Sequence, residues 1–209
     1  MLEFLQYDFV VRAFVAGIAT AVVAPLIGMF LVVRRYALMA DALAHVSLVG
    51  VALGLLTGIN PLASALVIAI VASMGMERLR ESKHVSGENV LALFLSGGLA
   101  IAVVLMSLSG GSGANLVSYL FGSITTVSAS DVILMIGISV LVLASVITLY
   151  KEFFFVSFNE TLAIASGLPV RLLNILLMIL AAMTVAISMR VVGVLLIGAL
   201  MVIPIVSAI

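Results

Sequence analysis

Long runs of uncharged, apolar residues follow one another along this sequence, with only short charged stretches between them. A helix needs about 20 such residues to cross the hydrocarbon core of a membrane, which is about 30 Å thick. Water is absent there, so a spanning segment must satisfy its own backbone hydrogen bonds as a helix. We therefore predict an all-α, polytopic transmembrane bundle with about seven spans, at residues 13–33, 37–56, 61–76, 90–109, 132–150, 172–189 and 191–209.

The composition agrees with a membrane protein and excludes other classes. Hydrophobic residues make up 65% of the chain, charged residues 9%, and the mean hydropathy is +1.46. These values predict contact with lipid and a single membrane domain over residues 1–209. The net charge is zero, which gives no indication of a nucleic-acid partner. The chain contains no cysteine, so any metal must be bound through oxygen and nitrogen.

One apolar segment, residues 116–130, is too short for a span and rich in serine and threonine. It follows a stretch rich in glycine and serine at 107–115. We expect a re-entrant or half-helix element, which is stable at membrane depth only where protein or a water-filled cavity surrounds it.

The basic residues predict the orientation of the bundle. If the spans alternate in direction, Arg12 and Arg190 lie on one side, and the other seven basic residues lie on the opposite side: Arg34, Arg35, Arg78, Arg80, Lys83, Lys151 and Arg171. Cytoplasmic loops are enriched in lysine and arginine, so the seven mark the cytoplasm. The N-terminus is then extracytoplasmic, residues 151–171 are cytoplasmic, and Arg190 extends toward the outer interface.

The second span contains two ionisable residues, Asp41 and His45, on one helix face. Ionisable side chains inside a membrane are energetically expensive and commonly mark a transport pathway. A carboxylate with an imidazole favours a metal ion as the transported species. The alternative is structural: Asp41 would cap a helix that begins within the membrane, and His45 would be a packed polar residue bonded to a carbonyl group.

The opposite face of this span carries three glycines at intervals of four residues, Gly50, Gly54 and Gly58. Small residues at this spacing allow another helix to approach closely. We predict a helix-packing surface there.

The segment between 151 and 171 contains the pattern of a short helix over 160–166. Asn159 is a suitable N-cap, Glu160 suits the first turn, Gly167 ends the helix and Pro169 opens the next span. The helix could rest on lipid headgroups as a connector, or it could dock a cytoplasmic partner. The chain has no phosphate-binding loop of the G-x-x-x-x-G-K-[ST] type, so ATP-driven work would need another subunit.

Four motifs resemble those of bacterial ABC importer permeases for zinc and manganese. They are VVRRYALMADALAHVSLVGVALG at 32–54, YLFGSI at 119–124, FNETLAIASGLPVR at 158–171 and VGVLLI at 192–197. The resemblance implies a homodimer in the bacterial cytoplasmic membrane, a cytoplasmic ATP-binding subunit and an extracytoplasmic metal-binding protein. It implies no catalytic residues and no permanently bound cofactor. It places Asp41 and His45 at the metal site, and assigns a coupling helix to the ATPase that involves Asn159, Glu160, Ala163, Gly167 and Pro169.

The sequence departs from this family in two places. It stops at residue 209 inside an apolar run, so we expect the further C-terminal spans of the family to be missing. It also has Val49 where the family commonly has proline, which bears on a kink after His45.

The residues and the resemblance predict the same function, import of Zn²⁺ or Mn²⁺ by an ABC permease. Asp41 and His45 from two copies would supply four ligands, which fits the tetrahedral preference of zinc and does not exclude manganese. A secondary transporter or proton relay that uses the same two residues is the alternative. An intramembrane enzyme is disfavoured, because the sequence has neither H-E-x-x-H nor G-x-S-x-G.

Overall fold

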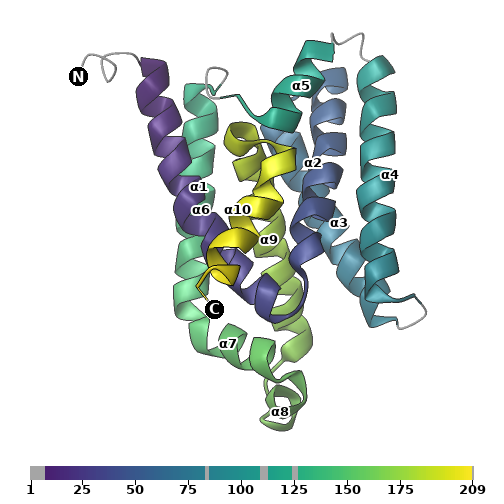
Figure 1. Ribbon diagram of the computed structural model, residues 1–209, viewed down its shortest axis with the longest axis vertical. Helices are drawn as coiled ribbons and strands as arrows, with labels where there is room; N and C mark the ends of the chain where they lie inside the picture. Colours follow the sequence, from purple (N-terminus) through teal and green to yellow (C-terminus); the bar gives the residue numbers. More distant parts are fainter. Residues whose placement is uncertain (1–7, 83–84, 109–112, 124–126, 209) are drawn as a thin grey trace.

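A computed structural model describes residues 8–82, 85–108, 113–123 and 127–208. Within these ranges the chain is helical with short connections and has no strand, which confirms the predicted all-α class (Figure 1). The elements are α1 (Asp8–Val33), α2 (Ala37–Thr57), α3 (Pro61–Glu81), α4 (Gly87–Leu108), α5 (Gly113–Phe121), α6 (Ala129–Thr148), α7 (Tyr150–Phe158), α8 (Glu160–Ala165), α9 (Val170–Val192) and α10 (Val194–Val206).

The described helices include six that are long and apolar enough to cross a membrane, namely α1, α2, α3, α4, α6 and α9. The seventh predicted span, 191–209, is wrong in its bounds. Val191 and Val192 complete α9, and Gly193, with φ of 88°, separates them from α10. Helix α10 has 13 residues, a length of about 20 Å against the core of about 30 Å.

Two other predicted boundaries differ from the structure. The short span at 61–76 continues to Glu81, because the charged residues of its last turns remain helical. Residues 116–130 do not form one element: α5 ends at Phe121, and α6 begins at Ala129 after a capping box between Ser128 and Asp131. Residues 124–126 lie outside the described part of the chain. A re-entrant path for this segment stays a prediction.

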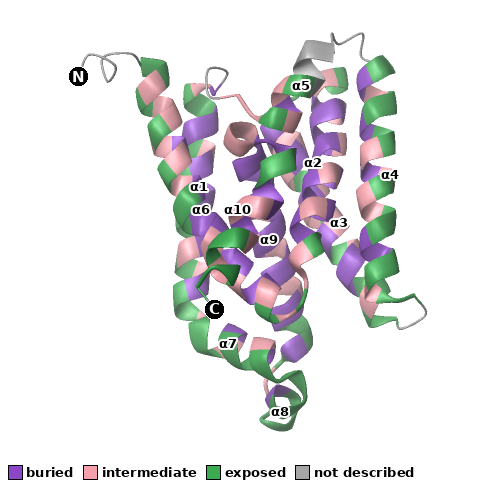
Figure 2. Cartoon of the chain, viewed as in Figure 1, coloured by how far each residue is buried: buried purple, intermediate pink, exposed green. Residues whose placement is uncertain are grey.

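Helices α2 and α9 form the centre of the bundle (Figure 2). Helix α2 contacts α3, α4, α9 and α10, and its buried side chains are largely alanine, valine and leucine. Large apolar side chains remain exposed on α1, α4 and α6, among them Phe14, Leu93, Ile133 and Ile147. An apolar exterior around a packed interior is the pattern expected of a protein that faces lipid.

The two ends of the bundle differ in charge. The start of α1 and helix α5 lie at one end, and α7 and α8 lie at the other (Figure 1). The connections and helix ends near α7 and α8 carry the described basic residues that the sequence assigned to the cytoplasm: Arg34, Arg35, Arg78, Arg80, Lys151 and Arg171. Lys83 lies outside the described residues. We call the α7–α8 end the basic end of the bundle.

Candidate functional site

Asp41 and His45 both lie in the N-terminal half of α2, which runs without a break from Ala37 to Thr57. Both side chains are half-buried in the single chain. The N-cap position is Tyr36, whose side chain makes no capping hydrogen bond, and Asp41 lies five residues further on. The alternative in which Asp41 caps a helix that begins within the membrane is therefore wrong.

The imidazole of His45 has an unsatisfied nitrogen. Its Nδ1 atom is buried and has no hydrogen-bond partner among the described residues. An unpaired buried polar atom is energetically unfavourable unless a ligand or water completes it. The Nδ1 atom thus lacks the partner that a metal ion, a water molecule or another polar group would supply.

Two glycines on neighbouring helices allow the backbones of α10 and α4 to pack closely against Asp41 and His45. A Cβ atom at Gly198 in α10 would overlap the carboxylate of Asp41 and would lie 2.8 Å from its Cγ atom. A Cβ atom at Gly98 in α4 would lie 3.1 Å from the carbonyl carbon of His45. Helices α10 and α4 can approach the two polar residues because both positions lack a side chain.

The predicted glycine surface is used at two of its three positions. A Cβ atom at Gly50 would lie 2.5 Å from Ala65 Cα, and one at Gly54 would lie 2.8 Å from Pro61 Cα, so both glycines pack against α3. Gly58 has open space beside it and takes no part in this contact. It has φ of 73° and ends α2 as a left-handed C-cap, a conformation that glycine adopts readily.

A single chain offers too few ligands for a complete metal site. No group of three or more histidine, cysteine, aspartate or glutamate side chains suited to a metal occurs in the part of the chain that the structure describes. Asp41 and His45 supply one carboxylate and one imidazole, while Zn²⁺ takes four ligands in closed sites. These two side chains alone do not complete such a site.

Helix α8, Glu160–Ala165, confirms the short helix expected at 160–166 to within one residue. The Asn159 side chain caps it by accepting a hydrogen bond from Leu162 N at 3.0 Å, and Gly167 follows its C-terminus with φ of 79°. Ala163 is buried, whereas Leu162 and Ile164 are exposed. The helix lies at the tip of the basic end (Figure 1).

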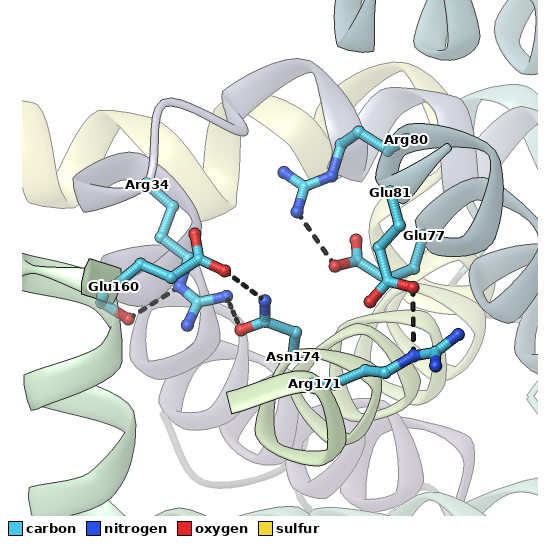
Figure 3. A network of polar contacts seen from close by, with 8 residues as sticks. Arg34, Glu77, Arg80, Glu81, Glu160, Arg171 and Asn174 are labelled. Atoms are coloured by element: carbon cyan, nitrogen blue, oxygen red, sulfur yellow. Dashed lines mark hydrogen bonds and ion pairs between the residues drawn. The ribbon is translucent and has the colours of Figure 1, made fainter. Parts of the chain in front are cut away.

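The sequence did not indicate a chain of hydrogen bonds that connects this tip to the bundle (Figure 3). Asn174 in α9 donates from Nδ2 to Glu160 Oε1 at 3.2 Å and accepts from Arg34 Nη1 at 2.8 Å. Arg34 also donates from Nε to Ser157 Oγ at 3.0 Å. Asn174 is only 4% exposed, whereas Glu160 is exposed, so the chain of bonds runs from the surface at α8 to a buried side chain of α9.

Arg34 lies between α1 and α2, where burial and nearby carboxylates have opposite effects on its pKa. Burial lowers the pKa of the Arg34 guanidinium from its ordinary value, while the carboxylates of Glu160 and Glu77 raise it. Arginine stays charged in proteins, because its delocalised guanidinium group holds its proton tightly. In the sequence, Asn174 could have indicated this network, because it is an amide near the start of a largely apolar span.

A second polar cluster faces the first across a cavity of about 460 Å³ (Figure 3). In α3, Arg80 Nη2 contacts Glu77 Oε1 at 2.9 Å, and Glu81 Oε2 contacts Arg171 Nε at 3.1 Å. The Arg80 guanidinium also lies over the Tyr36 ring, 4.0 Å from its centroid. Both clusters thus reach the connection between α1 and α2.

At the opposite end of the bundle, Arg190 is not extended toward the interface as expected. Its side chain is 17% exposed, and its Nη2 atom lies 3.7 Å from Asp131 Oδ2. Its guanidinium lies 5.0 Å from the centre of the Tyr119 ring, and its carbonyl oxygen accepts from Ser123 N. Arg190 therefore joins α9 to α5 and α6.

Comparisons with known proteins agree with the motifs. The model of the ABC 3 transport family matches residues 6–209. A manganese transport system membrane protein of Listeria innocua is 31% identical over 98% of this chain and 72% of its own length. A high-affinity zinc uptake system membrane protein of Haemophilus influenzae is 30% identical over 97% of this chain and 78% of its own length.

A solved structure, PsaBC from Streptococcus pneumoniae in complex with Fab, shares the fold. Its TM-score is 0.86 at 28% identity, covering 98% of this chain and 74% of the matched chain. The family match extends over nearly the whole sequence and confirms the resemblance inferred from the motifs. The chain therefore belongs to the ABC 3 transport family.

Proposed function

We propose that this chain is the permease subunit of an ABC importer that moves divalent metal ions into the cytoplasm. The geometry of α2 carries the proposal. Asp41 and His45 lie four residues apart on an unbroken helix, and the buried Nδ1 atom of His45 has no partner in the described part of the chain. Oxygen and nitrogen donors at that position suit zinc and manganese alike.

The incomplete ligand set favours a homodimer. Two copies related by a two-fold axis would bring two carboxylates and two imidazoles together. Four such ligands suit zinc in a tetrahedral site. The relatives include one named for manganese and one named for zinc, so competition between the two ions is the measurement that separates them.

Transport also needs an energy source and a supply of metal, which we assign to partner proteins. Helix α8, at the tip of the basic end, would be the coupling helix of a cytoplasmic ATPase subunit, through its exposed residues Leu162 and Ile164. An extracytoplasmic metal-binding protein would deliver the ion to the opposite end. The sequence motifs at 158–171 and the family match support this assignment.

The experiment is uptake of radioactive Zn²⁺ and Mn²⁺ by the permease reconstituted in liposomes with the ATPase subunit from the same bacterium. We expect uptake that requires ATP, and competition between the ions that identifies the preferred one. A variant ATPase unable to hydrolyse ATP is the control. Uptake that proceeds at full rate without ATP and follows a proton gradient would instead identify a secondary transporter and overturn the proposal.

A further inference from the structure

Side chains connect α8, the proposed coupling helix, to the turn between α1 and α2, which directly precedes the proposed metal-binding helix. Glu160 belongs to α8, Asn174 to α9, and Arg34 to the connection between α1 and α2. Asn174 uses its amide nitrogen toward Glu160 and its amide oxygen toward Arg34. One buried side chain thus bonds to both sides at once (Figure 3).

The connection between α1 and α2 is short and held tightly. Arg35 has φ of 61°, a left-handed conformation that a residue with a side chain rarely adopts. Tyr36 N donates to Leu31 O at 2.7 Å, and Met39 N donates to Tyr36 O at 2.9 Å. These bonds tie the turn both to the end of α1 and to the start of α2.

Side chains from two directions contact this turn. Arg34 is bound from the α8 side through Asn174, and Tyr36 is covered from the α3 side by Arg80. The cavity of about 460 Å³ separates the two sides, and its lining includes Asn174, Arg80 and Glu160. The two sides are therefore not fully packed against each other across this cavity.

Asp41 follows Tyr36 by five residues on the same unbroken helix, about 8 Å along its axis. A helix transmits displacement because its backbone hydrogen bonds keep it rigid over this length. Asp41 also contacts α10 at Gly198, where an added methyl group would overlap its carboxylate. A small shift of α2 would thus change the position of a metal ligand.

We propose that Asn174 is a positioning residue that transmits the docking state of α8 to Asp41, through Arg34 and the turn between α1 and α2. This inference rests on the proposed function, because it assigns the route by which the coupling helix acts on the metal site. Asn174 does not itself bind the ion.

The test measures Zn²⁺ and Mn²⁺ moved per ATP hydrolysed by the complete transporter. Asn174→Asp keeps an acceptor for Arg34, removes the donor to Glu160 and sets two carboxylates against each other. We expect the ratio of metal to ATP to fall at least about fivefold, the lower range of measured couplings between sites. The control is Thr184→Val in the same helix. It removes a buried hydroxyl group that donates a hydrogen bond to Leu180 O of α9.

A second variant separates transmission from general destabilisation. Asn174→Asp combined with Glu160→Gln exchanges the donor and the acceptor, so the new amide at 160 donates to the new carboxylate at 174. The bond to Arg34 is retained. The reference is Glu160→Gln alone, whose amide oxygen can still accept from Asn174. We expect the metal-to-ATP ratio of the double variant to return to within about twofold of that reference, the usual scatter of independent effects.

A wild-type ratio in Asn174→Asp would overturn the inference, and so would failure of the double variant to recover in a protein that remains folded and assembled. The proposed function has a different point of failure, because it requires ATP-driven metal uptake by the wild type. If the wild type transports with ATP and Asn174→Asp is equally well coupled, this inference alone is wrong.

Discussion

At the scale of single residues, the proposed metal site consists of two ionisable side chains, Asp41 and His45, and Gly198 leaves the space that the Asp41 carboxylate occupies. Asp41 and His45 could be selected from the sequence because ionisable groups are rare in apolar spans. Gly198 could not, because its importance comes from a contact with a residue far away in the sequence. Arg34 and Asn174, 140 positions apart, were missed for the same reason.

Replacing Gly198 tests this close approach. In Gly198→Ala the new methyl group would overlap the Asp41 carboxylate, so either α10 or Asp41 must shift. We expect metal uptake to fall about tenfold, which corresponds to about 1.4 kcal/mol and lies within the usual range for overpacking. Gly137→Ala in α6 is the control, because no atom lies within 4 Å of the added group. Equal uptake by the two variants would show that Asp41 does not need the space.

At the scale of helices, the sequence predicted the long elements and the capped helix α8 well, and the other short helices, α5, α7 and α10, poorly. Spans such as α2 and α4 contain apolar runs long enough, as helices, to cross the hydrocarbon core of a membrane. Such runs are easily recognised in a sequence. Helix α7 was not predicted, because the charged residues at its start, Lys151 and Glu152, indicated the end of a span and not a new helix. The break between α9 and α10 was predicted at Arg190, three residues before Gly193, because a charged residue marks the end of a span more clearly than a single glycine does.

The contact between α2 and α3 gives a prediction about stability. A methyl group at Gly50 would lie 2.5 Å from Ala65 Cα and 2.7 Å from Ser64 O, both backbone atoms that cannot rotate away. We expect Gly50→Ala to destabilise the protein by about 1–3 kcal/mol, measured as the loss of folded protein on heating in detergent. Gly97→Ala in α4, which has open space beside it, should melt like the wild type. If both variants melt alike, the close packing is not needed.

The end of α8 gives a prediction about coupling. Gly167 has φ of 79°, whereas proline is restricted to about −65°, so Gly167→Pro must rearrange the end of the helix. Under the proposed role of α8, the variant should insert normally but lose metal uptake and the stimulation of ATP hydrolysis by the permease. Uptake and stimulation at wild-type level, at equal expression, would remove α8 from the coupling role.

At the scale of the whole molecule, the separation of charge predicts how the bundle sits in the membrane. The basic end, with α7 and α8, should face the cytoplasm. Cysteines introduced at exposed serines can report this without interference, because the native chain has none. Ser82→Cys and Ser166→Cys should react with an impermeant thiol reagent only from inside, and Ser130→Cys only from outside. The reverse pattern would invert the topology and with it the direction of transport.

The proposed transport function of the whole bundle requires Asp41 to be a metal ligand. The structure removes the competing role of Asp41 as a helix cap, since α2 already begins at Ala37. Asparagine has the size of aspartate but lacks its charge and is a poorer metal ligand. Removing an intramembrane charge also lowers the cost of insertion, so the variant should reach the membrane.

The most direct measurement is uptake of radioactive Zn²⁺ and Mn²⁺ by Asp41→Asn at matched expression, with the exposed Asp8→Asn as control. We expect uptake by Asp41→Asn to fall about 100-fold or more, since even partners of metal ligands account for 10–100-fold in affinity. His45→Ala should lose as much, and the double variant no more than either single one. Uptake of both ions by Asp41→Asn near the wild-type level would contradict the account.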